Sequence, residues 1–467
     1  MKQDVTGPAD GRAITSDEGL RARLLGRQAE RESSARTYAR HLPVVPVHAQ
    51  GALVTGMDGR TYIDCLSGAG TLALGHNYPA VVDVLRATLE RRAPLHVLDM
   101  ITPEKDAFTS ELLGVLPGDL GGSARVHFCG PTGADAVEAA LKLARLATGR
   151  QGVVAFSGAY HGMTMGASAV SGGDRMRMLA GAGSAEVSRL PFPYDYRCPF
   201  GVGGGETARL SVQLLENLLD DPASGLALPA AVIVEVVQGE GGVIPASDNW
   251  LREVRRITEE RGIVLILDEV QTGVGRTGTF WACQRADVVP DILVMSKAVG
   301  GGLPLALIAY RPELDVWLPG DHTGTFRGNT LAMVAGEVTL RTVREERLDQ
   351  RAVTVGARLA EGLEQLVAAH GFLGQARGRG LMLGVEVVDP HGSPDRLGVL
   401  PPAPARAQAL RSACVDTGLL LELGGRHDTV LRLLPPLILS DAQADQILER
   451  LSVAFTRCAS WNGHEER

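Results

Sequence analysis

The sequence lacks the features that mark several classes of protein. None of its apolar runs approaches 18 uninterrupted residues, so no segment is predicted to span a membrane. The first 19 residues contain no apolar stretch of the kind found in secretory signals. Lys and Arg total 46 against 54 Asp and Glu, which leaves a net charge of -8 and no basic excess for a nucleic-acid backbone. We therefore expect neither a membrane nor a nucleic acid as partner.

Cysteine is also scarce, and no two cysteines form a CxxC pair. The sequence therefore predicts neither a zinc site nor a redox motif, and we expect no metal site. Scattered cysteines are typical of proteins in a reducing compartment, so a cytoplasmic location is expected. The six are Cys65, Cys129, Cys198, Cys283, Cys414 and Cys458.

Glycine, by contrast, is abundant, with 57 residues among 467. The glycines cluster in short loops and follow no repeat, which indicates turns and active-site loops. Hydrophobic residues make up 45% of the chain, enough for one or more large buried cores. No internal repeat or low-complexity linker divides the chain.

The order of the predicted elements indicates an α/β protein. Between about residues 120 and 320, short apolar runs alternate with helix-like stretches such as residues 135–149 and 249–262. Buried strands that alternate with helices predict a mostly parallel central sheet covered by helices on both faces. The apolar runs are ARVHFC, GVVAFSG, AAVIVEVV, GIVLILDEV and DILVMSK.

The two chain ends predict a second, smaller α/β domain. Residues 51–65 alternate around Asp58 and Gly59 and predict a β-hairpin, and residues 80–92 have helical spacing. After about residue 340, amphipathic helices surround two strand-like runs. The polar first thirty or so residues predict a mobile tail or a short docking helix. We expect three regions: a tail and small-domain segment (1–80), a large domain (81–335) and a C-terminal small domain (336–467).

The first chemical motif is GIVLILDEVQTGVGRTG, residues 262–278, in which an apolar strand ends at Asp268 and Glu269. Ligands of open α/β sheets bind beyond the carboxyl ends of the strands. A buried acid at this place needs a cationic partner or a proton, and a protonated cofactor ring nitrogen would be such a partner. By itself, the motif is more typical of an acidic pair that begins a loop.

The second motif is DILVMSKAVGGGLP, residues 291–304, another apolar strand that ends at Ser296 and Lys297. A lysine at a buried strand end can have a lowered pKa and can form a Schiff base with an aldehyde. The three glycines would let a bulky cofactor approach the backbone. A surface lysine in a turn would be the ordinary interpretation, but Asp268, 29 residues earlier, favours a cofactor site.

Two weaker motifs follow other strands. Residues 130–133, GPTG, lead into an amphipathic helix, whose free N–H groups and positive dipole end suit a phosphate. The alternative is a plain helix cap by Thr132 or Asp135. In SGAYHGMTMGA, Tyr160 and His161 follow a strand end, and an aromatic ring there could stack on a flat ligand. A core Tyr and a satisfied core His would explain the same residues.

Together, these motifs resemble the class III family of pyridoxal-phosphate (PLP) aminotransferases of fold type I. The DEVQTGxGRTG and SKxxGGGxP blocks, in this order and spacing, carry most of the resemblance, which spans roughly residues 31–437. The resemblance implies a large PLP domain, a small domain from both chain ends, and a homodimer with shared active sites.

The resemblance also implies roles for individual residues. Lys297 would hold PLP as a Schiff base and Asp268 would keep the ring nitrogen protonated, so that the ring acts as an electron sink. Thr325, in HTGTFRGN, would reach the phosphate in the partner subunit, and Glu240 and Arg432 would form a switch that binds the two substrates in turn. The remaining cofactor contacts would be Thr132, Gly133 and Ala134 on the phosphate, Val270 and Tyr160 on the two ring faces, His161 beside Tyr160, and Gln271 at the ring hydroxyl.

A narrower resemblance concerns the amino donor. Residues 32–46, 64–79 and 314–332 are similar to diaminobutyrate–2-oxoglutarate aminotransferases, most clearly in WLPGDHTGTFRGN. The resemblance implies transfer of the terminal amino group of L-2,4-diaminobutanoate to 2-oxoglutarate, giving L-aspartate 4-semialdehyde and L-glutamate. Met163 stands where ornithine and aminobutyrate relatives carry an arginine, which disfavours those donors.

Three alternatives stay open. The chain could be a class III transaminase for another ω-amino donor, which a panel of donors would separate. It could be a PLP mutase or decarboxylase on the same scaffold, and a mutase would consume no keto acid. It could also be a binding module without catalysis, although the presence of both Lys297 and Asp268 argues against that. Fold analogy alone does not choose among them.

Overall fold

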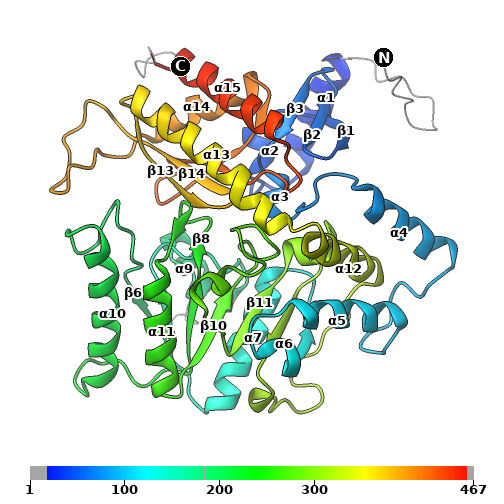
Figure 1. The fold of residues 1–467 in the computed structure, drawn as a ribbon, viewed down its shortest axis with the longest axis vertical. Coiled ribbons are helices and arrows are strands. Elements are labelled where there is room, and N and C mark those ends of the chain that lie inside the picture. Colours follow the sequence, from blue (N-terminus) through cyan, green and yellow to red (C-terminus); the bar gives the residue numbers. More distant parts are fainter. Residues whose placement is uncertain (1–17, 182–185, 460–467) are drawn as a thin grey trace.

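The computed structural model describes residues 18–181 and 186–459, and it stacks a smaller upper part on a larger lower part (Figure 1). The lower part contains a seven-stranded sheet. Strands β11, β10, β7, β5 and β6 are parallel, and β12 runs antiparallel to both of its neighbours. The predicted mostly parallel sheet is therefore confirmed. In spatial order the strands are β4 (Arg125–Phe128), β12 (Leu307–Tyr310), β11 (Ile292–Met295), β10 (Val264–Asp268), β7 (Ala231–Glu235), β5 (Val153–Phe156) and β6 (Val187–Leu190).

Helices cover both faces of this sheet, as the apolar runs predict. In β10, Leu265 and Leu267 belong to the core cluster that also contains Trp250 and Val254 of α11 (Asp248–Glu260). The alternate residues of β10 belong to a separate cluster formed with the alanine-rich face of α7 (Gly133–Thr148). Because successive side chains of a strand point to opposite faces, α11 and α7 lie on opposite sides of the sheet.

The upper part combines both ends of the chain. The predicted hairpin is present as β2 (Leu53–Gly56) and β3 (Thr61–Asp64), which pair antiparallel. Strand β15 (Leu419–Leu420), from the other end of the chain, pairs parallel with β3 and completes a sheet with β1 (Pro46–Gln50). The prediction of a smaller α/β unit from both chain ends is confirmed.

A second sheet of the upper part is formed entirely by C-terminal residues and is accompanied by three helices (Figure 1). Its strands, in order, are β13 (Leu373–Arg379), β14 (Met382–Val387), β17 (Val430–Leu433) and β16 (Glu422–Gly424), and the helices are α13 (Leu348–Ala369), α14 (Pro404–Asp416) and α15 (Asp441–Arg457). The predicted boundary at residue 335 falls inside α12 (Thr330–Glu345), and the division into three regions stays a prediction.

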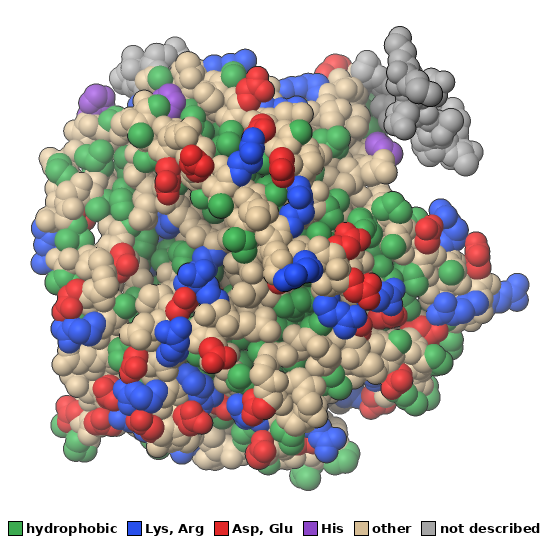
Figure 2. Space-filling model, in the orientation of Figure 1, with side chains coloured by type: hydrophobic (Ala, Val, Ile, Leu, Met, Phe, Trp, Pro, Cys, Tyr) green, Lys and Arg blue, Asp and Glu red, His purple; other side chains and the backbone are tan. Residues whose placement is uncertain are grey.

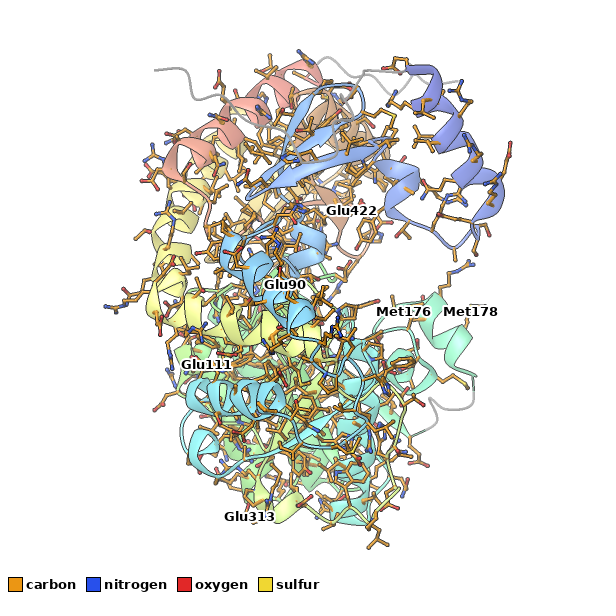
Figure 3. The ribbon with its side chains drawn as sticks, turned by 90° about the vertical axis from the view of Figure 1, so that its right-hand side faces the viewer. Glu90, Glu111, Met176, Met178, Glu313 and Glu422 are labelled. Atoms are coloured by element: carbon orange, nitrogen blue, oxygen red, sulfur yellow. The ribbon has the colours of Figure 1, made fainter. Side chains whose placement is uncertain are left out.

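The N-terminal region begins, among the described residues, with helix α1 (Glu18–Arg31). The expected tail before it lies outside the described residues. The helical spacing of residues 80–92 corresponds to α4 (Pro79–Glu90). Figure 3 shows Met176 and Met178 on α9, at the side of the molecule. The remaining elements are α2 (Tyr38–His41), α3 (Ser67–Gly70), α5 (Pro103–Val115), α6 (Leu120–Ser123), α8 (Met165–Val170), α9 (Asp174–Ala180), α10 (Gly205–Asp220), β8 (Val237–Gln238), β9 (Ile244–Pro245), and the 3-10 helices η2 (Ala282–Ala286), η3 (Lys297–Gly300) and η4 (Pro312–Leu314).

The loop after β10 connects the two parts. Arg276, in the GRTG portion of the first motif, is buried, and its guanidinium donates hydrogen bonds to the carbonyls of Leu381 and Pro435. Burial lowers the pKa of Arg276 to about 10. The motif therefore has a structural function besides the acid at its start. No helix among the described residues has the length and apolarity that a membrane crossing requires.

Candidate active site

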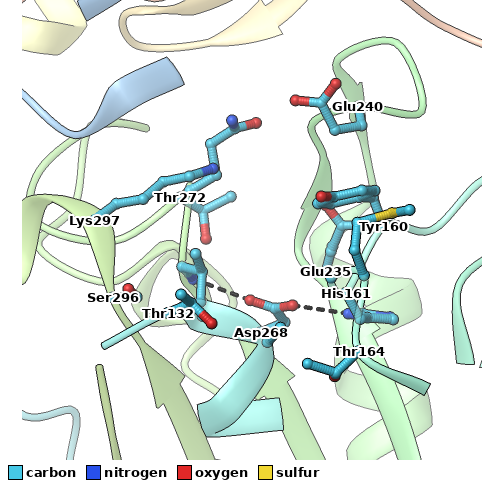
Figure 4. A pocket seen from close by; sticks show the side chains of 16 residues that line it. Thr132, Tyr160, His161, Thr164, Glu235, Glu240, Asp268, Thr272, Ser296 and Lys297 are labelled. Atoms are coloured by element: carbon cyan, nitrogen blue, oxygen red, sulfur yellow. Dashed lines mark hydrogen bonds and ion pairs between the residues drawn. The ribbon is translucent and has the colours of Figure 1, made fainter. Parts of the chain in front are cut away.

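A cavity of about 480 Å³ opens at the carboxyl ends of the central strands (Figure 4). Lys297 reaches into it from one side, Tyr160 and Glu240 face it from the other, and Asp268 lies between them (Figure 4). Ten of the twelve residues predicted for the site line this cavity. The full lining is Thr132, Gly133, Ala134, Tyr160, His161, Gly162, Met163, Thr164, Glu235, Glu240, Asp268, Val270, Gln271, Thr272, Ser296 and Lys297.

Asp268 ends β10 and is held by two hydrogen bonds. Its Oδ2 lies 2.7 Å from His161 Nδ1, and its Oδ1 accepts from the N–H of Val270 at 3.1 Å. Burial alone would lower the pKa of His161, but the hydrogen bond that its ring donates to Asp268 and the charges of Asp268 and Glu235 raise it. The His161 side chain is thus a partner of Asp268, and it orients the carboxylate toward the cavity.

Lys297 follows β11 and is held in an unusual backbone conformation. Its φ is 51°, in the left-handed region that a non-glycine residue rarely adopts. Such strain costs on the order of 1 kcal/mol or more and is concentrated at functional sites. Burial lowers the pKa of Lys297, although the charges of Glu240 and Asp268 act in the opposite direction. A neutral amine is the nucleophilic form, so this environment favours reaction with a carbonyl.

The three glycines after Lys297 lie in a tightly packed turn. They do not line the cavity. A Cβ on Gly301 would lie 2.4 Å from the carbonyl oxygen of Ala335 in α12, and a Cβ on Gly300 would lie 3.0 Å from Leu305. The lack of a side chain on Gly301 thus allows this turn to pack against α12, and the expectation that the glycines admit a cofactor stays a prediction.

The N-terminus of α7 forms the third side of the cavity. Thr132 caps the helix in a reciprocal arrangement with Asp135: the Asp135 N–H donates to Thr132 Oγ1, and the Thr132 N–H donates to the Asp135 carboxylate at 3.0 Å. The N–H groups of Gly133 and Ala134 have no helical partners because they belong to the first turn. The plain-cap interpretation of Thr132 is correct. Gly133 and Ala134 also line the cavity, and free N–H groups at a helix N-terminus suit an anion, so their role as a phosphate site stays a prediction.

Glu240 and Arg432 form the ion pair that the resemblance implies. Arg432 Nη1 lies 2.7 Å from Glu240 Oε1; the arginine side chain is 1% exposed and the glutamate side chain 33%. Glu240 lines the cavity and Arg432 lies behind it. The one predicted site residue outside this group is Thr325, which is exposed and whose carbonyl lies 2.9 Å from His96 Nε2. The roles of these residues stay predictions.

Sequence reasoning missed Glu235, which ends β7 directly beside Asp268. The two residues are register partners on neighbouring parallel strands, and Glu235 is buried. Burial raises the pKa of Glu235 to about 7, with Asp268 adding to the effect and His161 opposing it. The signal was present, because AAVIVE is an apolar strand that ends in an acid, as the strand before Asp268 does. The other cavity residues that were not predicted, such as Thr164, Thr272 and Ser296, lie inside the motifs described above, but nothing in those motifs singles them out from their neighbours.

We expect the ionisation of Glu235 to oppose folding as the pH rises. The folded protein retains this proton up to about pH 7, whereas the unfolded chain loses it near the usual 4.5, so the stability contributed by the neutral form is lost between these values. His161, Asp268, Tyr160 and Lys297 face the group. Relative to Glu235→Gln, the cofactor-free wild type should lose about 2 kcal/mol between pH 5.5 and 8.5 in urea unfolding. If the difference in unfolding free energy between the two proteins does not change with pH, Glu235 ionises in the folded protein as it does in the unfolded chain.

The lining residues fit a flat, phosphate-bearing aromatic cofactor. Three buried polar atoms of the lining have no partner among the described residues: His161 Nε2, Thr164 Oγ1 and Gln271 Oε1. A Cβ on Gly133 would lie 3.1 Å from Val270, so glycine leaves open the space between the helix N-terminus and the Val270 side chain. The site thus offers an anion site, a buried carboxylate for a ring nitrogen, an acceptor for a ring hydroxyl, and an amine.

The family follows from comparison with known proteins. The family model described as "Aminotransferase class-III" matches residues 34–455. This chain belongs to the class III aminotransferases. The predicted fold class and the resemblance of the two motif blocks are therefore confirmed. Membership of this enzyme family also argues against the alternative of a binding module without catalysis.

Individual relatives align with nearly the whole length of this chain. The diaminobutyrate–2-oxoglutarate aminotransferase of Rhizobium meliloti (strain 1021) is 53% identical over 93% of this chain and 92% of its own length. The protein with the same description from Haemophilus influenzae is 46% identical over 91% of this chain and 93% of its own. Among solved structures, an amine transaminase from an uncultivated Pseudomonas species, in its PLP-bound internal aldimine form, is 29% identical with a TM-score of 0.81, covering 92% of this chain and 98% of its own.

Proposed function

We propose that this protein is a PLP-dependent aminotransferase that moves the terminal amino group of L-2,4-diaminobutanoate to 2-oxoglutarate. The observation that carries the proposal is the cavity that gathers Lys297, Asp268 and the N-terminus of α7. The sequence identity of 53% with a diaminobutyrate–2-oxoglutarate aminotransferase supports the choice of substrates. The products are L-aspartate 4-semialdehyde and L-glutamate.

The residues around the cavity would have different roles in the reaction. PLP, when bound, supplies an electron sink for the negative charge that develops on the substrate carbon. Lys297 would hold it covalently, the N–H groups of Gly133 and Ala134 would bind its phosphate, and Asp268 would keep its ring nitrogen protonated. Once displaced by the substrate, the Lys297 amine takes the proton from the amino-bearing carbon. Val270 and Tyr160 exclude water from the two faces of the ring.

A screen of amino donors against 2-oxoglutarate, with products identified, tests this function. Diaminobutanoate should give the highest kcat/KM, and glutamate should form in equal amount to the donor consumed. Higher activity with ornithine, 4-aminobutanoate or another ω-amino donor would replace the donor but keep the chemistry. Turnover without keto-acid consumption would instead indicate a mutase or decarboxylase.

Arg432 and Glu240 are expected to discriminate between the two substrates. Paired, they present little net charge to the diamine; unpaired, Arg432 can bind the α-carboxylate of the keto acid in a bidentate manner. Arg432→Lys should lower kcat/KM for 2-oxoglutarate by roughly 10- to 100-fold, the effect of losing a charged hydrogen bond, and that for diaminobutanoate little. Glu240→Ala should favour glutamate over the diamine as donor. Single-turnover measurement of both half-reactions tests whether the pair discriminates between the two substrates.

The diamine half-reaction serves as the internal control for Arg432→Lys, and the keto-acid half-reaction serves for Glu240→Ala. A static ion pair that only joins the two parts of the molecule would affect both half-reactions equally in both variants. That outcome would remove the switch and leave the pair a structural role.

We propose that the active enzyme is a homodimer. Exposed apolar side chains occur on two segments, residues 95–101 and 318–326, and include Ile101 at 72% and Leu318 at 70% exposure. The two segments lie together, since His96 contacts both the Thr325 carbonyl and the Phe326 ring. Exposed apolar surface of this kind marks protein interfaces. A second copy seated here would bring Thr325 to its partner's site, and a monomer in light scattering would exclude it.

The location and the class of partner follow from weaker signals. All six cysteines are free thiols, which fits the proposed cytoplasmic location. In Figure 2, basic and acidic side chains are interspersed over the visible face. This mixture supports small-molecule substrates as the partners, since nucleic-acid binding requires a basic patch.

A further inference from the structure

Glu235 occupies a central position among the strand ends that form the site. It lies at the end of β7, between β10, which carries Asp268, and β5, whose following loop carries Tyr160 and His161. It lines the cavity and is only 7% exposed. No described interaction places its carboxylate on Lys297, so the chemistry described above does not use it.

Both oxygens of this carboxylate bind backbone N–H groups of neighbouring loops. Oε1 accepts from the N–H of Tyr160 at 2.8 Å, and Oε2 accepts from the N–H of Gly239 at 3.0 Å. These contacts are 75 and 4 residues away in the sequence. Each oxygen therefore fixes the backbone of one loop, and one buried side chain links the two.

The two loops carry the residues that face the cofactor and the substrate. The first presents Tyr160 to the cavity, and the second presents Glu240, one residue after Gly239. The loops also touch directly, since a Cβ on Gly241 would lie 2.4 Å from the carbonyl oxygen of Gly158. A displacement of either loop would therefore affect the other.

The second loop is tied to the upper part of the molecule as well. The Glu240 carbonyl accepts from the N–H of Gly425 at 2.9 Å, and the Gly242 carbonyl accepts from Arg377 Nε at 2.9 Å. On the side of the central sheet, Glu235 supplies the corresponding hydrogen bond, to the N–H of Gly239. The loop that carries Glu240 is thus held by hydrogen bonds from both parts of the molecule, and of the residues that hold it Glu235 is the one that lines the cavity.

We propose that Glu235 is a positioning residue that sets, through one buried carboxylate, both the stacking of Tyr160 on the cofactor and the placement of Glu240 toward Arg432. Two backbone donors require two acceptor oxygens, which the ionised Glu235 carboxylate supplies above about pH 7 and an amide does not supply at any pH. Glutamine in this position would turn its NH₂ group toward one of the two N–H groups, leaving a buried donor unpaired. The inference rests on the proposed substrates for the role of Glu240, and on the proposed cofactor alone for that of Tyr160.

Glu235→Gln in the PLP-loaded enzyme tests the proposal, with Glu269→Gln as the matched control. Glu269 is also buried, directly after a central strand, and its two oxygens also accept backbone N–H groups, those of Ala282 and Cys283. Its Oε2 accepts from the Thr272 hydroxyl as well. It does not line the cavity. Both variants should lose a similar amount of thermal stability, because each leaves one buried N–H unpaired.

Two readouts should separate the variants. The circular dichroism of the bound cofactor reports how Tyr160 holds the ring, and we expect it to fall at least twofold in Glu235→Gln only. The ratio of kcat/KM for diaminobutanoate to that for glutamate reports the placement of Glu240. We expect this ratio to fall by about 3- to 10-fold in Glu235→Gln, the effect of one hydrogen bond, and to stay within twofold in Glu269→Gln.

Cofactor dichroism equal to that of the wild type in Glu235→Gln would overturn the proposal. It would also be overturned if Glu240→Ala shifts the substrate ratio and Glu235→Gln does not. If Glu240→Ala itself leaves the ratio unchanged, the proposed switch fails, and the dichroism alone decides the role of Glu235. Glu235→Ala removes both acceptors, so it should reduce the cofactor dichroism more than Glu235→Gln does. A smaller reduction in Glu235→Ala would contradict a positioning role.

Discussion

Lys297→Ala is expected to abolish transamination while the protein stays folded and still binds PLP. The side chain is buried at the cavity and provides both the amine that would hold the cofactor and the base that moves the proton. A general acid–base residue alone contributes about 10²- to 10⁴-fold to a rate, so kcat should fall by at least about a thousandfold. Loss of the covalent link should also remove the absorbance band of a Schiff base near the visible edge.

Borohydride reduction provides the control for this variant. Reduction should attach the cofactor permanently to the wild type and leave it removable by dialysis from Lys297→Ala. Alanine also suits the left-handed backbone at this position no worse than lysine does, so the fold should survive the change. Near-normal turnover by the variant would show that the central assignment is wrong.

Asp268→Asn is expected to slow the first half-reaction far more than it weakens cofactor binding. Asparagine keeps the shape of the side chain, and its oxygen can still accept the hydrogen bond that Val270 now donates. It cannot supply the negative charge that keeps a ring nitrogen protonated. Removal of a preorganised electrostatic partner costs about 10²- to 10³-fold in rate. Single-turnover rates at saturating PLP measure the chemistry, and fluorescence titration with PLP measures the binding.

His161 gives this experiment a second variant. His161→Asn would remove the ring that holds Asp268 Oδ2 and leave the carboxylate charge in place. We expect its rate to lie between those of the wild type and Asp268→Asn. Equal losses of binding and chemistry in Asp268→Asn would instead assign Asp268 to the scaffold.

The sequence predicts the core of the site because its signals are local. Asp268 and Lys297 each end an apolar run, and the carboxyl ends of parallel strands meet at one edge of a sheet. Glu235 ends a similar run, yet without a flanking motif an acid at a strand end is equally typical of an ordinary loop. Its importance comes from the register of β7 beside β10, which periodicity does not determine.

Other features depend on contacts between distant residues. The Glu240–Arg432 pair joins residues 192 apart, and only the family resemblance connected them. The antiparallel direction of β12 left no trace in its apolar sequence, because a strand buried on both faces has the same composition in either direction. The close packing of Gly301 was not predicted either, because its neighbour in α12, Ala335, lies more than thirty residues further along the chain.

The parallel pair of β3 and β15 has a consequence for biosynthesis. Ile63 pairs with Leu419, about 350 residues later in the chain. At a translation rate of about 5–20 residues per second, the edge of β3 waits roughly 20–70 s on the ribosome before its partner strand exists. During that time the large domain can fold, while an unpaired edge stays available to other nascent chains or to a chaperone. The amino-terminal sheet, although begun first, is thus completed only after every strand of the central sheet has been made, and a ribosome that stalls before residue 419 releases a chain with an open edge.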